Sequence, residues 1–200
     1  MKKLLDRVSS LLPIHPVALV TSVGKDNNPN IMTVGSIAHI SNVPPTLGIG
    51  VSPTHLSYVL IEETKDFVVN FPTADLLWET DFIGTGGSGR EIDKFEVTGL
   101  TPIEATKVRS PLIKECPLNL ECILRERLVI GAPKDHDWLV GEVVATHVDE
   151  EIMNEKGNMD LNKARVIAFG AWNEEYWDLG KRLGDRGLFR KASNPRSGIT

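Results

Sequence analysis

The segment with the most evident chemistry is a glycine-rich run. Residues 84–89 read Gly-Thr-Gly-Gly-Ser-Gly and match the G-x-G-x-x-G pattern letter for letter. A dinucleotide fingerprint needs a strand just before it, a helix just after it and an acidic residue about 20 positions on. The preceding segment is expected to be helical, so we reject a Rossmann site. Backbone N–H groups of the run could still approach an anion, with Arg90 and Lys94 supplying charge; a plain surface loop is the alternative.

The rest of the sequence contains no self-sufficient catalytic set. There is no P-loop lysine pattern, and Arg90 stands where a G-x-S-x-G elbow needs its last glycine. Five histidines are scattered without metal-ligand spacing: His15, His39, His55, His136 and His147. The run 135–137, Asp-His-Asp, is more simply a hairpin turn beside Pro133. We therefore expect no metal and no catalytic side chain, so the protein either only binds a ligand or relies on a cofactor for its chemistry.

The elements that would position such a site are mostly strands. Segments rich in β-branched residues or alternating in polarity predict strands at 17–23, 30–40, 46–51, 66–71, 120–129, 138–148 and 164–172. The first two should form a hairpin, because Lys-Asp-Asn-Asn-Pro at 25–29 is strong turn chemistry. Short connections of this kind favour an antiparallel barrel with helical decorations over a doubly wound parallel sheet.

Short helices are expected between the strands. They should lie before Pro13, from 52 to 63, from 74 to 82, from 93 to a closing Gly99, and from 176 to 183. In the second of these, Pro53 suits the first turn and Thr54 is a candidate cap. In the third, Leu77 and Trp78 are expected on the buried side.

Composition fits one globular domain over residues 1–200, with a core from about 13 to 180 and a basic tail at 185–200. Of the 200 residues, 41% are hydrophobic and 24% charged, which is ordinary for such a chain. Lys plus Arg number 22 and Asp plus Glu 27, and this net charge of −5 argues against nucleic-acid or anionic-membrane partners. No apolar run approaches the roughly 20 residues of a membrane span. Asp6, Arg7 and Ser9 break a signal-peptide core, so we expect a cytoplasmic protein.

Two cysteines, Cys116 and Cys122, lack the C-x-x-C spacing of a zinc or redox site. On a strand they would share a face but lie too far apart to bond. We interpret them as reduced, half-buried thiols, and their role stays open.

Several segments taken in order resemble the flavin reductase-like, FMN-binding split-barrel proteins, and within that group flavoredoxins. No single motif is specific, but the order and spacing agree from about Pro16 to Gly180. The segments are 30–34 (Asn-Ile-Met-Thr-Val), Pro44-Pro45, 50–55 (Gly-Val-Ser-Pro-Thr-His), 63–70 (Glu-Thr-Lys-Asp-Phe-Val-Val-Asn), Ser88-Gly89, 93–95 (Asp-Lys-Phe), 120–122 (Leu-Glu-Cys), His136, 140–143 (Val-Gly-Glu-Val) and Tyr176-Trp177 with Leu179-Gly180.

The resemblance implies a six-stranded, antiparallel, Greek-key-like split barrel. It would form a homodimer with one FMN per subunit near the interface. Residues of the second strand would line the flavin ring: Met32, Thr33, Val34, Gly35 and Ser36. Others would pass beneath the ribityl chain: Gly50, Val51 and Ser52. His55 and Ser57 would face the phosphate, with Asn70, Ser88 and Lys94 as supporting contacts.

Elementary chemistry agrees with that arrangement. An FMN phosphate carries close to two negative charges, which a helix N-terminus with hydroxyls and a cation suits. Backbone groups on a strand edge can hydrogen-bond the pyrimidine end of the ring. Taken singly, Thr33, Ser36, Asn70 and Lys94 could equally be ordinary strand, turn or surface residues.

Two departures from the family pattern matter. Members often carry Arg where His55 stands and Thr where Ser57 stands, and many have a bulky aromatic near Ser36. With His55, phosphate affinity should fall as the pH rises past its pKa. Without the aromatic, the ring would be less covered, which leaves the second substrate open.

Three functions follow as hypotheses. The first is an FMN-dependent oxidoreductase that takes electrons from transiently bound NADH or NADPH, or from a protein donor, with the chemistry at flavin N5. Its redox partner would be a small molecule or a protein. The second is a non-catalytic FMN binder or electron carrier. The third is a flavin-free split-barrel interaction module.

Overall fold

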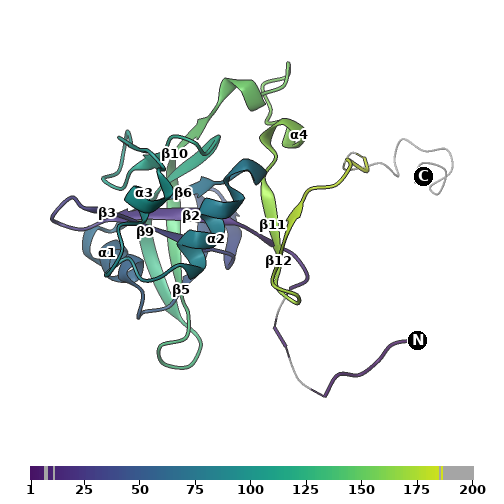
Figure 1. Cartoon of the computed structure of the whole chain (residues 1–200), viewed down its shortest axis with the longest axis horizontal. Coiled ribbons are helices and arrows are strands. Elements are labelled where there is room, and N and C mark those ends of the chain that lie inside the picture. The colour runs from purple at the N-terminus through teal and green to yellow at the C-terminus, as the bar shows by residue number, and fades with distance from the viewer. Residues whose placement is uncertain (7–8, 11, 185, 187–200) are drawn as a thin grey trace.

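The computed structural model describes residues 1–6, 9–10, 12–184 and 186. Within them, one large antiparallel sheet forms the body of the molecule (Figure 1). It has seven strands in the order β3-β2-β6-β9-β10-β5-β4. Its strands, in chain order, are β2 (Ala18–Val23), β3 (Pro29–Val34), β4 (Ile37–Asn42), β5 (Pro45–Val51), β6 (Asp66–Phe71), β9 (Leu118–Val129) and β10 (Asp137–Val148). The mainly β, antiparallel architecture expected from the sequence is confirmed.

Smaller elements surround this sheet. Two small sheets consist of β1 (His15–Pro16), β11 (Ile167–Gly170) and β12 (Glu175–Asp178), and of β7 (Pro102–Ile103) and β8 (Leu112–Ile113). The helices are α1 (Leu56–Thr64), α2 (Leu77–Thr85), α3 (Lys94–Thr98) and α4 (Leu161–Ala164), with 3₁₀ turns η1 (Ala74–Leu76) and η2 (Glu150–Ile152). Figure 1 shows β11 and β12 as a hairpin beside the body of the large sheet.

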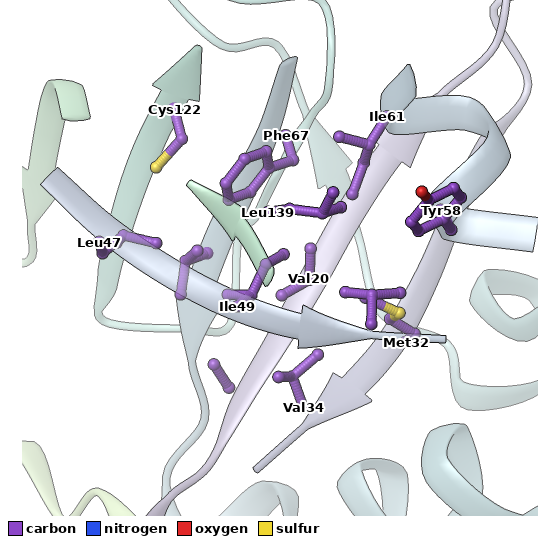
Figure 2. Close-up of a cluster of buried hydrophobic side chains, with 13 residues drawn as sticks. Val20, Met32, Val34, Leu47, Ile49, Tyr58, Ile61, Phe67, Cys122 and Leu139 are labelled. Atoms are coloured by element: carbon purple, nitrogen blue, oxygen red, sulfur yellow. The ribbon is translucent and has the colours of Figure 1, made fainter. Parts of the chain in front are cut away.

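The core lies on both faces of β2, whose six residues are all buried. Because side chains alternate along a strand, Ala18 and Val20 enter the barrel core, whereas Leu19 packs on the other face with Ile83 and Phe95 from α2 and α3. Figure 2 shows the barrel core, with side chains from the strands and α1 converging: Val20, Met32, Val34, Leu47, Ile49, Tyr58, Ile61, Phe67, Cys122 and Leu139.

The strand predictions hold where the pattern is longest. The expected hairpin of the first two strands is β2–β3, and the two long alternating strands are β9 and β10. The predicted strand 30–40 is interrupted at Gly35 and Ser36, where the chain leaves β3 and begins β4. The last predicted strand, 164–172, is shorter and follows α4.

The helix predicted at 176–183 is wrong, because this stretch contains β12. Trp177 lies opposite Ala168 of β11, and Tyr176 opposite Phe169. Aromatic residues favour a pleated, half-buried surface, so pairing with β11 overrides the helical spacing.

Three further helix predictions need correction. No helix forms in the described residues before Pro13; residues 7, 8 and 11 lie outside them. The residue preceding α1 is His55, not Thr54, and no side chain caps this helix. Leu77 and Trp78 are exposed, while Thr80 and Ile83 form the buried side of α2. The short helix ending at Gly99 is confirmed as α3, with Gly99 in the left-handed conformation at φ 69°.

Both cysteines are free and fully buried, so the expectation of reduced thiols agrees with the structure, although they are not half-exposed. Cys116 precedes β9 instead of lying on it. Burial raises the pKa of both thiols, so they stay protonated. Apart from Arg186, the predicted basic tail at 185–200 lies outside the described residues.

Candidate functional site

The candidate site is a cleft along β3. This strand pairs only with β2 in the large sheet, so its other edge has no strand partner within the described chain. A hollow of about 280 Å³ lies here, walled by β3, the start of α1 and the segment between α2 and α3. It brings together six of the predicted residues: Met32, Thr33, His55, Ser57, Ser88 and Lys94.

One wall is the N-terminus of α1, which begins at Leu56. No side chain caps this end, and its first turn has no acidic residue. The first N–H groups of a helix lack partners within the helix, and the helix dipole adds positive potential there. Ser57 lies in this turn, and its Oγ accepts a 2.6 Å hydrogen bond from Asn30 Nδ2, leaving the hydroxyl hydrogen for another acceptor. This wall is suited to an anion.

A buried cation forms the facing wall. Lys94 is 8% exposed, and its Nζ donates to the carbonyl oxygen of Ile83. An ammonium has three hydrogens, so two remain for a ligand. Burial lowers the pKa of Lys94 because it penalises the charged form. An anion in the cleft would favour the charged form of Lys94 and offset that effect of burial.

A titratable group lies at the rim. Burial lowers the pKa of His55, and the positive charges of His136 and Lys94 lower it further. His136 comes from the connection between β9 and β10, which is tied to the α1 entry because Ser52 Oγ donates to the Lys134 carbonyl at 3.0 Å. Three groups that can carry positive charge therefore lie near one another at this end of the cleft.

The glycine-rich run has a packing role. Helix α2 runs into it as far as Thr85, which agrees with rejecting a Rossmann turn. A Cβ on Gly84 would lie 3.3 Å from Thr33 Cβ, and one on Gly89 only 2.0 Å from Asn30 Oδ1. The absence of side chains thus lets this segment close against β3, with exposed Ser88 at the edge of the cleft.

The residues predicted to line the flavin ring differ in which of their atoms, side chain or backbone, are available at the cleft. The side chains of Met32 and Val34 belong to the barrel core, so only their backbone is available at the edge (Figure 2). Thr33 Oγ1 donates to the Thr80 carbonyl at 2.6 Å. Gly35 and Ser36 lie in a second hollow of about 300 Å³ that also includes Thr33. The two hollows therefore adjoin at Thr33.

Besides Val34, four predicted residues line neither hollow. Gly50 N donates to Ser36 O at 2.7 Å, and a Cβ there would lie 2.9 Å from Ser36 Cβ, so this glycine lets β5 approach the end of β3. Val51 belongs to the core, and Ser52 to the turn before α1. Asn70 is fully buried, and its side chain bonds Leu19 O, Ile113 N and Asn119 Nδ2.

Sequence reasoning passed over Asn30, Gly84 and Gly89 as site residues. Asn30 was part of the resemblance, but its contact with Ser57 joins positions 27 residues apart and leaves no local signal. The glycines were singled out as a run, without a way to tell which of them touch β3.

Residues 13–165 match the model of the flavin reductase like domain family. The chain belongs to this family. It is 34% identical over 157 residues to an uncharacterized protein of Archaeoglobus fulgidus, a match that covers 78% of this chain and 84% of the relative.

Two solved flavoredoxins have a similar structure. That of Desulfovibrio vulgaris (Miyazaki F) superposes with a TM-score of 0.86 at 28% identity, covering 93% of this chain and 97% of the other. That of Methanosarcina acetivorans gives 0.84 at 28% identity, covering 93% and 96%. The predicted split-barrel fold and family resemblance are confirmed, and the comparisons support a flavin-related oxidoreductase function.

Among the described residues, no cluster of three or more His, Cys, Asp or Glu side chains could hold a metal ion. None of the helices in this part of the chain has the length and apolarity to span a membrane.

Proposed function

We propose that the chain is an FMN-dependent oxidoreductase of the flavin reductase or flavoredoxin type. The observation that supports this most is the composition of the cleft. An uncapped helix N-terminus, a serine and a buried lysine meet at one end. From there the edge of β3, unpaired within the described residues, runs to Val34, and Gly35 and Ser36 follow it.

The phosphate end fits the donor set. A phosphate monoester carries about −1.5 to −2 charges near pH 7 and offers three strong acceptor oxygens. The first-turn N–H groups of α1, the Ser57 hydroxyl and the Lys94 ammonium are donors, and no acidic side chain lines this hollow. Gly89 keeps Asn30 against Ser57, which fixes that hydroxyl.

The ring end fits a flat heterocycle. Backbone N–H and C=O groups on the free edge of β3 alternate in direction, which matches the donors and acceptors of a pyrimidine ring. Thr33 is held by Thr80, so it has one orientation at this edge. The bound flavin would supply hydride or electron transfer. The chain's own residues would bind, orient and shield it.

The electron donor in this proposal is NADH, NADPH or a protein, and the acceptor is a small molecule or a protein. We also propose a homodimer with the flavin near its interface. Apolar side chains exposed on α2 and β12 support this, among them Leu77, Trp78 and Trp177. Trp78 also stacks on Phe82, with ring centroids 5.3 Å apart, which presents a flat apolar surface. Light scattering of the wild type and of Trp78→Ser tests this: the variant should shift toward monomer.

The test of function is the visible absorption spectrum of the purified protein, recorded anaerobically before and after NADH or NADPH. Flavin bands that bleach with a nicotinamide support a reductase. Bands that bleach only with dithionite contradict the nicotinamide donor and favour an electron carrier or FMN binder. A colourless protein that FMN does not reconstitute overturns the flavin proposal and leaves an interaction module.

A further inference from the structure

The first turn of α1 is fastened to β10 by a buried hydrogen bond. Tyr58 points from this turn into the barrel core (Figure 2), and its hydroxyl donates to Asp137 Oδ2 at 2.7 Å. Asp137 is the first residue of β10 and is itself buried. The Tyr58 oxygen also accepts a 2.9 Å hydrogen bond from Arg127 Nη1 of β9. Two neighbouring strands therefore hold one hydroxyl group of the helix.

The chain just before the helix is held by the same strand. Asp137 lies directly opposite Val51, the last residue of β5, in the ladder between β5 and β10. Residues 52–55 connect Val51 to α1, so both ends of this connection are fixed to β10, one by the ladder and the other by Tyr58. A segment held at both ends leaves the start of α1 little freedom to shift or rotate.

The orientation of this turn matters because its backbone forms a wall of the cleft. The N–H groups of Leu56, Ser57 and Tyr58 are among the first four of α1, which have no partner within the helix. Several donors bind one anion well only when they converge on it, and a displacement of about 1 Å weakens such a site. Whatever fixes the backbone at Tyr58 therefore also sets how well this wall can hold a phosphate.

We propose that Asp137 is a positioning residue for the phosphate end of the cleft, and that it acts through Tyr58 on the first-turn N–H groups of α1. This inference rests on the proposed function. Neither side chain lines the hollow itself, so the effect must pass through the helix backbone. Burial raises the pKa of Tyr58, and its hydrogen bond to Asp137 raises it further, so the phenol keeps the hydrogen that it donates.

The charge of Asp137 cannot be its contribution to phosphate binding, because a carboxylate disfavours a nearby anion. The hydrogen bond to Tyr58 and the charge can be separated by substitution. Asp137→Asn removes the charge but keeps a side-chain oxygen that accepts from Tyr58. Asp137→Leu removes both. The inference requires that Asp137→Asn binds phosphate normally and that Asp137→Leu does not.

The experiment compares the affinities of the full-length protein for FMN and for riboflavin, which has the same ring and ribityl chain but no phosphate. Tyr58→Phe keeps the ring and removes the hydroxyl. It should weaken FMN binding about three- to tenfold while riboflavin affinity stays within about twofold. Asp137→Leu should behave in the same way, and adding Asp137→Leu to Tyr58→Phe should cause no further loss.

A matched control lies at the other end of the same helix. Thr64 Oγ1 donates to the Leu60 carbonyl at 3.0 Å, so Thr64→Val also removes one hydroxyl hydrogen bond from α1. This variant should keep the wild-type ratio of the two affinities. The ³¹P resonance of bound FMN gives a second measurement, since in Tyr58→Phe it should move away from its wild-type position and toward that of free FMN.

The outcomes separate this inference from the proposed function. A loss confined to FMN in Tyr58→Phe and Asp137→Leu, with Asp137→Asn near the wild type, supports the inference. Equal weakening of both flavins assigns the bond to the fold alone and overturns it, as does an unchanged FMN affinity and ³¹P shift in Tyr58→Phe. A loss in Asp137→Asn as large as in Asp137→Leu also overturns it.

Two further results have a fixed meaning. If Asp137→Leu does not fold, Tyr58→Phe decides, because it changes only one buried hydroxyl. A wild type that binds neither flavin overturns the proposed function and this inference with it. In contrast, a wild type that prefers FMN, with variants that keep the same preference, overturns the inference and leaves the proposed function standing.

Discussion

Two places in the molecule gather buried polar side chains, and they differ in how many of their polar atoms have hydrogen-bond partners. Glu121 on β9 is fully buried, and its oxygens accept hydrogen bonds from the backbone N–H groups of Thr106, Lys107 and Val108. The Thr106 hydroxyl and His147 Nε2 add two more, at 2.8 and 2.6 Å. This set, which we call the loop clamp, fastens an irregular segment to the sheet.

The cleft at β3 has the reverse character. The α1 N-terminus has no side-chain cap, and buried Lys94 donates to the Ile83 carbonyl. His15 Nε2 is buried without a hydrogen-bond partner among the described residues. Buried polar groups that are satisfied stabilise the fold, whereas unsatisfied ones cost stability and are kept where a ligand completes them. The loop clamp should therefore control stability, and the cleft should control ligand binding.

Removing the loop clamp should have the largest effect. Glu121→Ala leaves several buried N–H groups without an acceptor, so the free energy of unfolding should fall by about 3–5 kcal/mol in urea titrations. FMN affinity of the folded fraction should stay within about twofold of the wild type. The control is Glu126→Ala, a solvent-facing carboxylate on the same strand. If Glu121→Ala kept normal stability but lost FMN affinity, the result would contradict the assignment of stability to the loop clamp and of ligand binding to the cleft.

Acid should weaken the same contacts. Burial alone would raise the pKa of Glu121, but hydrogen bonds from Thr106, His147 and Lys107 outweigh it and lower that pKa to about 2. A carboxyl whose pKa is depressed by folding stabilises the protein above its unfolded pKa, and this contribution disappears as the pH falls. Wild-type stability should thus decrease between about pH 4.5 and 2. In Glu121→Gln this part of the decrease should vanish; an identical curve would refute the assignment.

Lys94→Met should affect binding and spare the fold. The variant removes a charge-assisted contact to phosphate, so FMN affinity should fall about 10- to 100-fold in an equilibrium titration. Stability without FMN should be equal or higher, because a buried charge is replaced by an apolar side chain of similar length. Lys114→Met, at an exposed position, is the control. Equal affinities for the two variants would place the phosphate elsewhere.

The smallest expected effect is a pH dependence due to His55. Its lowered pKa keeps the ring mostly neutral near pH 7, and protonation on acidification adds a positive charge at the phosphate end. FMN affinity of the wild type relative to His55→Gln should therefore rise a few-fold as the pH falls below about 6.5. The ratio cancels protonation of the phosphate itself, which has a second pKa near 6. A ratio that is flat with pH would exclude a role for His55.

Most of the sheet could be predicted because its strands carry their own signals. β2, β6, β9 and β10 are rich in β-branched residues or alternate in polarity, and turn residues separate β2 from β3. The failures lie where tertiary context decides. β12 becomes a strand only because β11 is there to pair with it, and Trp78 is exposed although its spacing suggested the core.

The candidate site could also be predicted only in part. His55, Ser57 and Lys94 came from a resemblance in motif order, and the fold places them around one hollow. Asn70 shares that motif pattern, yet its side chain bonds buried residues such as Leu19, Ile113 and Asn119, which no local sequence pattern reveals. His15 Nε2 has no hydrogen-bond partner among the described residues, and its burial depends on the sheet that β1, β11 and β12 form, which only the three-dimensional structure shows.

The most direct test of the central claim is a crystal structure of the protein with FMN. The account predicts a phosphate bonded to the first-turn N–H groups of α1, to Ser57 Oγ and to Lys94 Nζ, with the ring along the edge of β3 from Thr33 to Ser36. A phosphate bound away from Ser57 and Lys94, or a ring that does not touch β3, would contradict it.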